Sequence, residues 1–409
     1  MVYAKDFSGK NDTEIIANAI KNREDDGVVV ISSFGDKKEW LLDSAVILPS
    51  NTTIIIDNCK IKLSDLCRDN FFRTEDCKTL SNKLENIHII GKGNAWLEGA
   101  EHPRATGDFA KILANPAPHT TEDLIKYAPW ISDEHKQSGN ITYDDANSHT
   151  YGTDAGKEGV SQYGTSENFG ILFKNVDRFS IENISLKDTH CFGIVIYAGR
   201  NGRITNIHFE NHLYKMIDGM KQTIENQDGI DILQGSHDII VSDITGITGD
   251  DVVALGCNNS KNTAKAQLTN QIGGNIENDD ESFSPDVRNI IVRNIKATSV
   301  YAWIIRLLPV EASIYNIIID NIIDTSPKSG SAGAVVVGFS DEYGKNLPES
   351  NRDICISNVI SNGYQGAVVI HGYMANSVIS NVICKNKNVK PIVITRENGI
   401  KNVQMSNII

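Results

Sequence analysis

The sequence predicts an all-β fold, a single-stranded right-handed parallel β-helix with a helical cap at its N-terminus. A four-residue motif, apolar-x-Asn/Asp-apolar, recurs along the chain. Its third residue occupies the positions Asn183, Asn206, Asp243, Asn294, Asn321, Asn358, Asn381 and Asn407. Successive positions are 23, 37, 51, 27, 37, 23 and 26 residues apart. A basic step of about 23–27 residues is typical of a solenoid, whose stacked units bury each other's apolar faces.

The segments between these motifs read as short β-strands. Runs such as 317–319 and 335–337 consist of Ile or Val, which favour strands, and no helical period passes through them. A leucine-rich horseshoe needs periodic Leu, and a β-sandwich does not place Asn at one phase of every unit. The repeated Asn fits a tight corner, because it tolerates left-handed backbone and bonds its neighbours. We expect these Asn side chains to stack from coil to coil.

The first 100 residues fit the same plan with a cap. Residues 11–13 (Asn-Asp-Thr) precede an apolar-periodic run over 14–20, which predicts an N-capped helix. Strands are expected at 27–31, 52–56 and 87–90. A helix over the first coil covers an otherwise open end of the stack.

One domain is predicted over residues 1–409, with loop insertions at about 101–168 and 258–285. Both insertions are polar and lack the strand pattern. Insertions in solenoids often lie on the binding face. Trp130 and Tyr151 are therefore expected to wall a cleft.

Composition excludes some partners. The net charge of −13 argues against nucleic acid, which requires basic patches. No run of 18 apolar residues predicts a membrane span. The N-terminus has no signal-peptide pattern, which favours the cytoplasm or a secreted protein whose signal has been removed. The seven cysteines have no zinc-type spacing, so we expect reduced, mostly buried thiols and no metal site. The oligomeric state is not indicated.

Acidic residues cluster in two segments, Asn226-Gln227-Asp228-Gly229-Ile230-Asp231 and Gly249-Asp250-Asp251. Asp228 and Asp250 are 22 residues apart, close to one coil. Stacked strands are about 4.8 Å apart, so these carboxyls can face each other. Glycosidic hydrolysis uses such a pair, one to protonate the leaving oxygen and one to activate water. Crowding keeps one member protonated near neutral pH. Asp231 is expected to be a neighbouring turn or supporting residue.

At these residues the chain resembles glycoside hydrolase family 28, the polygalacturonases. The resemblance rests on Asp12-Thr13 before the helix, the segment 48–53 (Leu-Pro-Ser-Asn-Thr-Thr), the coil repeats and two motifs. Residues 226–228 stand for the family's Asn-Thr-Asp, and residues 249–251 for its Gly-Asp-Asp. It implies a right-handed β-helix that hydrolyses a carbohydrate with inversion, without metal or cofactor.

The resemblance also implies roles for single residues. Asp250 would be the general acid, and Asp228 with Asp251 would hold and activate the water. Asn226 and Gln227 would lie beside them as substrate-binding residues.

Two family motifs are altered. The place of the family's Gly-His-Gly holds the second insertion, with Gly273-Gly274 and no His. The family's Arg-x-Lys, which grips the sugar carboxylate, appears here as Arg306-Leu307-Leu308. With Leu308 in place of the lysine, we hypothesise a neutral or differently charged sugar.

Three more residues are candidate substrate contacts. Arg306 is expected to touch ligand or the acidic cluster, Trp303 to pack in the core or form a sugar platform, and His190 to line the groove. Strand alternation places Trp303 and Arg306 on opposite faces unless a bulge intervenes. His371 is expected in the core or at the surface.

Two other functions use the same residues. β-Helix polysaccharide lyases bind Ca²⁺ with Asp clusters and use a basic residue as the base, a reading open to Asp228, Asp250 and Asp251 with Arg306. A non-catalytic glycan-binding fibre or adhesin would need no acid cluster. Replacing Asp250 by alanine separates them, since binding survives in an adhesin and turnover collapses in an enzyme.

Overall fold

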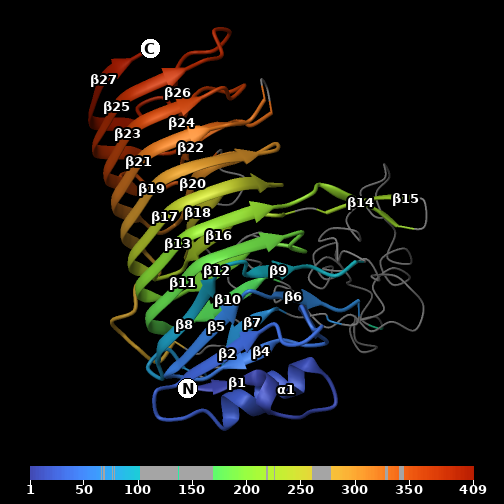
Figure 1. Ribbon diagram of the computed structural model, residues 1–409. Coiled ribbons are helices and arrows are strands. Elements are labelled where there is room, and N and C mark those ends of the chain that lie inside the picture. Colours follow the sequence, from blue (N-terminus) through green and yellow to red (C-terminus); the bar gives the residue numbers. More distant parts are fainter. Residues whose placement is uncertain are drawn as a thin grey trace.

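The computed structural model describes residues 1–65, 67, 70–75, 77, 79–101, 137, 169–217, 220–224, 226–259, 278–327, 330–339 and 345–409. Trp130, Tyr151, Gly273 and Gly274, with most of both predicted insertions, lie outside these residues. The described chain winds into a right-handed parallel β-helix, as predicted. Figure 1 shows the coils stacked between the two chain ends.

Two parallel sheets run along the stack. The 15-stranded wide sheet contains β1 (Val2–Tyr3), β2 (Val28–Ser32), β3 (Glu39–Leu42), β5 (Thr52–Asp57), β6 (Lys60–Leu63), β8 (Leu84–Lys92), β9 (Trp96–Glu98), β11 (Val176–Lys187), β13 (Arg200–Glu210), β17 (His237–Thr248), β19 (Val287–Ser299), β21 (Ile314–Asp324), β23 (Asn351–Ser361), β25 (Met374–Cys384) and β27 (Ile400–Ile408).

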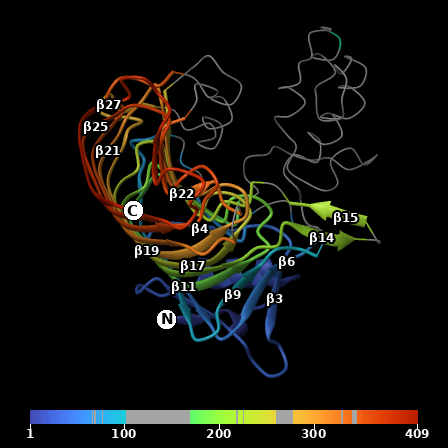
Figure 2. The same ribbon diagram turned by 90° about the horizontal axis from the view of Figure 1, so that it is seen from above.

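The 10-stranded narrow sheet carries the shorter strand of each coil. It contains β4 (Val46–Leu48), β7 (Phe72–Thr74), β10 (Ile171–Lys174), β12 (Ile194–Tyr197), β16 (Ile230–Leu233), β18 (Val253–Asn258), β20 (Trp303–Val310), β22 (Gly333–Val337), β24 (Val368–Ile370) and β26 (Ile392–Ile394). An antiparallel hairpin, β14 (Tyr214–Ile217) with β15 (Met220–Thr223), extends away from the stack in Figure 2.

Helix α1 (Asp12–Lys21), preceded by the 3₁₀ turn η1 (Ala4–Asp6), caps the first coil as predicted. The Asn11 side chain accepts the backbone N–H of Glu14 at 2.9 Å, which satisfies one of the free donors of the first turn. Ile16 and Ile20 are buried in the same apolar cluster as the coils. The helix therefore closes the N-terminal end of the core. The predicted strands at 27–31, 52–56 and 87–90 correspond to β2, β5 and part of β8.

The Asn motif marks a corner in each long strand from β11 to β27, as predicted. All of its third residues have positive φ, from 51° at Asn407 to 60° at Asp243. Their side chains bond along the stack, for example Asn206 to Asn183 at 2.8 Å and Asn381 to Asn358 at 3.0 Å. The ladder bends at each corner without losing pairing on either side of it.

The interior between the sheets is one continuous apolar cluster, dominated by Ile and Val. Every cysteine is a free thiol, and only Cys355 is partly exposed, which confirms the prediction for these residues. No helix in the described part of the chain is long and apolar enough to cross a membrane.

Candidate active site

The two acidic segments meet at the entry to the narrow sheet. Asp228 lies just before β16, and Asp250 and Asp251 lie between β17 and β18. The Gln227 carbonyl accepts the backbone N–H groups of Gly249 at 3.1 Å and Asp250 at 3.2 Å. These bonds hold the two turns in register, one coil apart, as the spacing predicted.

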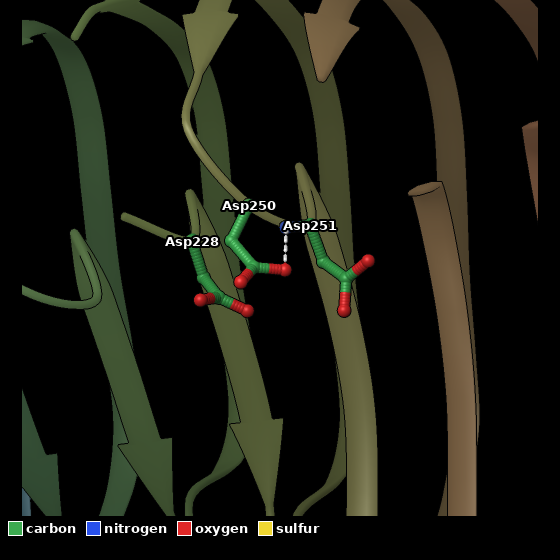
Figure 3. Close-up of side chains that lie close together, drawn as sticks. All are labelled: Asp228, Asp250 and Asp251. Atoms are coloured by element: carbon green, nitrogen blue, oxygen red, sulfur yellow. Dashed lines mark hydrogen bonds between the residues drawn. The ribbon is translucent and has the colours of Figure 1, made fainter. Parts of the chain in front are cut away.

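The three carboxyls face one another across adjacent coils, with Asp250 between the others (Figure 3). One carboxylate oxygen of each of Asp228, Asp250 and Asp251 lies within 4.8 Å of the other two. The backbone N–H of Asp251 donates to Oδ1 of Asp250 at 2.9 Å, which orients the Asp250 carboxyl. The cluster is thus held by the backbone that carries it. The same spacing suits one hard divalent cation, which prefers carboxylate oxygens.

Asp251 is held by the next coil. Its Oδ1 accepts the Trp303 backbone N–H at 2.9 Å, and its Oδ2 accepts from Arg306 Nη1 at 3.3 Å. The Asp251 side chain is only 3% exposed and that of Arg306 is 20% exposed. Arg306 therefore touches the acidic cluster, as expected from the sequence.

Burial raises the pKa of all these carboxyls, because the charged form loses its hydration. Burial, with Asp251 next in importance, raises the pKa of Asp250 to about 7. Burial followed by the Asp250 charge raises the pKa of Asp228 well above its usual value. Burial also raises the pKa of Asp251, against the opposing effect of Arg306. The cluster therefore retains protons near neutral pH.

Asp231 also belongs to this group of buried carboxyls. From the sequence, it was expected to be a neighbouring turn or supporting residue. It lies inside β16 between the core residues Ile230 and Ile232, so its side chain points to the outer face. Its Oδ2 is buried without a hydrogen-bond partner in the described structure. Burial, with Asp251 and Asp250 adding to it, raises the pKa of Asp231 well above its usual value.

We expect Asp231→Asn to stabilise the protein at pH 8 by about 1–3 kcal/mol, because the amide cannot ionise and so avoids the cost of a buried, unpaired carboxylate. An Asp in the unfolded chain titrates near pH 4, whereas a buried Asp with a raised pKa titrates at a higher pH. Between these two pKa values, rising pH lowers the free energy of unfolding. The gain should therefore vanish near pH 4. Urea unfolding of both proteins at the two pH values measures it. An equal gain in the free energy of unfolding at pH 4 and pH 8 would show that the Asp231 charge is not the cause.

A corner at the start of β20 decides where Trp303 and Arg306 point, and the partner strand repeats it, with Ala334 and Val335 both in the core. Ile304 and Ile305 are consecutive, yet both belong to the core. The ladder pairs Trp303 with Gly333 and Ile305 with Val335, and skips the residue between. Trp303 and Arg306 consequently share the outer face without a bulge, because the register is the same on both sides of Ile304, so the prediction of opposite faces was wrong. They line a common cavity of about 330 Å³.

The sequence missed His371 as a site residue. It lines the same cavity as Trp303 and Arg306, and its ring meets that of Trp303 edge-on at 6.4 Å between centroids. Its Nδ1 lies 2.9 Å from the Thr395 hydroxyl. Phe339 and Gln365 complete the wall. Only the stacking of later coils brings these residues to Arg306.

Two of the other predicted contacts, Gln227 and His190, are hydrogen-bonded within the protein. Gln227 is fully buried, and its Nε2 donates to the Thr189 carbonyl at 2.9 Å. Asn226 is partly buried, in left-handed backbone at φ 50°. His190 is 2% exposed, and its Nε2 accepts the Ala100 backbone N–H at 2.8 Å. A larger hollow of about 700 Å³ beside α1 contains none of these residues, and the chemistry places the candidate site at the carboxyls.

No protein-family model matches the chain, and no curated protein sequence is similar to it. Solved structures are similar in fold. An exopolygalacturonase from Thermotoga maritima has a TM-score of 0.53 at 17% identity, over 99% of this chain and 92% of its own. The Yersinia enterocolitica family 28 exopolygalacturonase has a TM-score of 0.52 at 12% identity, over 99% of this chain and 78% of its own. The Streptococcus pneumoniae surface adhesin PfbA has a TM-score of 0.51 at 12% identity, over 99% of this chain and 97% of its own. At these identities the likeness shows the β-helix fold alone.

Proposed function

We propose that this chain is a glycoside hydrolase that cleaves an O-glycosidic bond of an oligo- or polysaccharide by metal-independent acid–base catalysis with inversion. The observation that carries the proposal is the outward-facing trio Asp228, Asp250 and Asp251, with the pKa of Asp250 raised to about 7. A carboxyl with such a pKa can donate a proton at neutral pH. The resemblance of the two acidic motifs to family 28 supports the same assignment.

In the proposed mechanism Asp250 protonates the glycosidic oxygen as the bond to the anomeric carbon breaks. Asp228 and Asp251 hold a water, which loses a proton to the ionised Asp251 as it attacks that carbon. Before this transfer Arg306 balances the negative charge of Asp251. Trp303 and Phe339 offer apolar walls for a sugar ring beside the cluster.

The spacing of the carboxyls makes product stereochemistry a test of this mechanism. Inverting glycosidases usually hold their carboxyls about 6.5–9.5 Å apart, and retaining ones about 5–5.5 Å. Here one oxygen of each carboxyl lies within 4.8 Å of one oxygen of the others, which is below both ranges. Two carboxyls sharing one water would permit inversion at this distance. NMR of the first product anomer decides, and a retained configuration would make one of the carboxylates a nucleophile instead.

The substrate is proposed to be a neutral or differently charged sugar, not unesterified galacturonate. Leu308 replaces the family's lysine, and Arg306 is engaged by Asp251. The test is a panel of plant and bacterial glycans that includes polygalacturonate. Cleavage of another glycan names the substrate, whereas rapid cleavage of polygalacturonate would refute the specificity part of the proposal.

The pH profile provides a further prediction. Because Asp250 must be protonated to act, kcat/KM should fall as pH rises through about 7, tenfold per unit above it. Initial rates on the cleaved glycan from pH 5 to 9 measure this limb. A rate that stays constant to pH 9 would contradict the role of Asp250.

Two alternatives are separated by the same assays. The first is a calcium-dependent lyase, which is favoured because the spacing of the three carboxyls suits one divalent cation. It would require Ca²⁺ and yield an unsaturated product absorbing in the ultraviolet. A non-catalytic glycan-binding protein would bind glycans and cut none, with or without Ca²⁺.

A further inference from the structure

A second polar cavity lies at the opposite end of the narrow sheet's strands from the carboxyls. Asp228 precedes β16, whereas this cavity adjoins Ala198 and Gly235, just beyond the ends of β12 and β16. It has a volume of about 260 Å³. Its walls include Lys83, Arg200, His237, Asp280, Phe283 and Arg288.

Basic residues concentrate in this cavity although the chain has a net charge of −13. Arg200, His237 and Arg288 are paired in register on the adjacent strands β13, β17 and β19. Strand spacing places them about 4.8 Å apart along the stack. Lys83 adds a fourth basic side chain from another segment.

Two distant segments close the cavity. Asp279 accepts the backbone N–H of Ser81 at 2.9 Å and also the Ser81 hydroxyl. The loop that carries Phe283 is thereby joined to the turn that carries Lys83. The Phe283 ring packs against Gly235, where a Cβ would lie only 2.5 Å from the ring, and the φ of +71° also favours glycine. The result is a walled pocket and not an open basic surface.

Arg200 is the unusual member. Its Nε and Nη2 atoms are buried, and neither has a hydrogen-bond partner among the described residues. Burial lowers the pKa of the guanidinium, with Asp177 and Asp280 acting in the other direction. Buried polar groups in native proteins are almost always hydrogen-bonded, so two free donors on one guanidinium require an explanation.

The nearby carboxylates already have other partners. Asp177 pairs with Arg178 at 3.1 Å and accepts from Asn201 at 2.7 Å. Asp280 accepts the backbone N–H and the hydroxyl of Ser282. Neither carboxylate is hydrogen-bonded to Arg200, which lines the cavity, so its Nε and Nη2 have no acceptor among the described residues.

We propose that this cavity binds a small oxyanion, a carboxylate or phosphate group on a molecule of about monosaccharide size. Two N–H donors of one guanidinium match two oxygens of such a group. His237 and Arg288 stand beside it on the next coils, and Phe283 offers an aromatic wall to a ring. The site is separate from the carboxyl cluster and independent of glycan cleavage.

Thermal melting of the full chain tests the site. The probes are inorganic phosphate and galacturonate at matched ionic strength, with sodium chloride and glucose as controls. We expect at least one oxyanion to raise Tm with the logarithm of its concentration, as a ligand of the native state does. A rise in Tm with galacturonate alone indicates a carboxylate site, and a rise with phosphate alone indicates a phosphoryl site. A rise with both indicates a general oxyanion site. If neither raises Tm more than chloride and glucose do, the proposal is wrong.

Arg200→Met and the matched control Arg203→Met locate the effect. Arg203 lies on the same strand, is exposed and lines no part of the cavity. The ligand shift should disappear in Arg200→Met and persist in Arg203→Met. Without ligand, Arg200→Met should melt no lower than the wild type, because it removes unsatisfied buried donors. A wild-type ligand shift in Arg200→Met, or melting well below Arg203→Met without ligand, would overturn the proposal.

Discussion

Replacing Asp250 by Asn is expected to lower kcat/KM on the cleaved glycan by about 10²–10⁴-fold, the usual contribution of a general acid. The amide has nearly the shape of the carboxyl, and its oxygen can still accept the Asp251 N–H that orients Asp250. What is lost is the proton held at neutral pH by a pKa of about 7. Product release from the glycan identified in the panel measures the change.

The matched control is Asp353→Asn. Asp353 is on β23 in left-handed backbone at φ 56°, where Asn316 and Asn376 occupy the equivalent corners of the neighbouring coils. This variant should keep full activity. Asp250→Asn should also keep the wild-type Kd for the glycan, which separates lost chemistry from lost binding. Full activity in Asp250→Asn would remove Asp250 from the mechanism.

Replacing Arg306 by Met is expected to reduce the free energy of unfolding by about 3–5 kcal/mol at pH 8, the usual cost of breaking a buried ion pair. Asp251 would lose its cation while remaining buried. Arg306 also lowers the pKa of Asp228, Asp231 and Asp250, so its removal raises each of them further.

The pH dependence of this loss identifies its cause. A raised carboxyl pKa costs stability only as pH rises from about 4 through the folded pKa. The variant should therefore approach the wild type at pH 4 and fall furthest behind at pH 8. The alkaline limb of kcat/KM should move upward in any activity that remains. Urea unfolding at both pH values measures the first effect, with exposed Arg203→Met as control. A pH-independent loss would point to packing instead.

The sequence predicted the β-helix because its signals are local. An Asn or Asp at each corner satisfies a left-handed backbone wherever it occurs, so positions such as Asn294 and Asn321 revealed the coil period directly. A second corner series lies five residues earlier in each long strand and was missed. Its members include Arg178 and Asp238 as well as Asn, so residue type alone does not mark it.

For the candidate site, the sequence by itself determined which coils carry Asp228, Asp250 and Asp251, since a spacing near one coil brings side chains together in any stacked solenoid. Only the tertiary structure decided the rest. The corner at Ile304 and Ile305, both in the core, places Trp303 on the face of Arg306, which strand alternation alone does not predict. Whether a polar side chain is buried, and with what partner, depends on neighbouring coils and distant loops. That is why the buried Asp231, the ring of His371 beside Trp303 and the free donors of Arg200 became visible only in three dimensions.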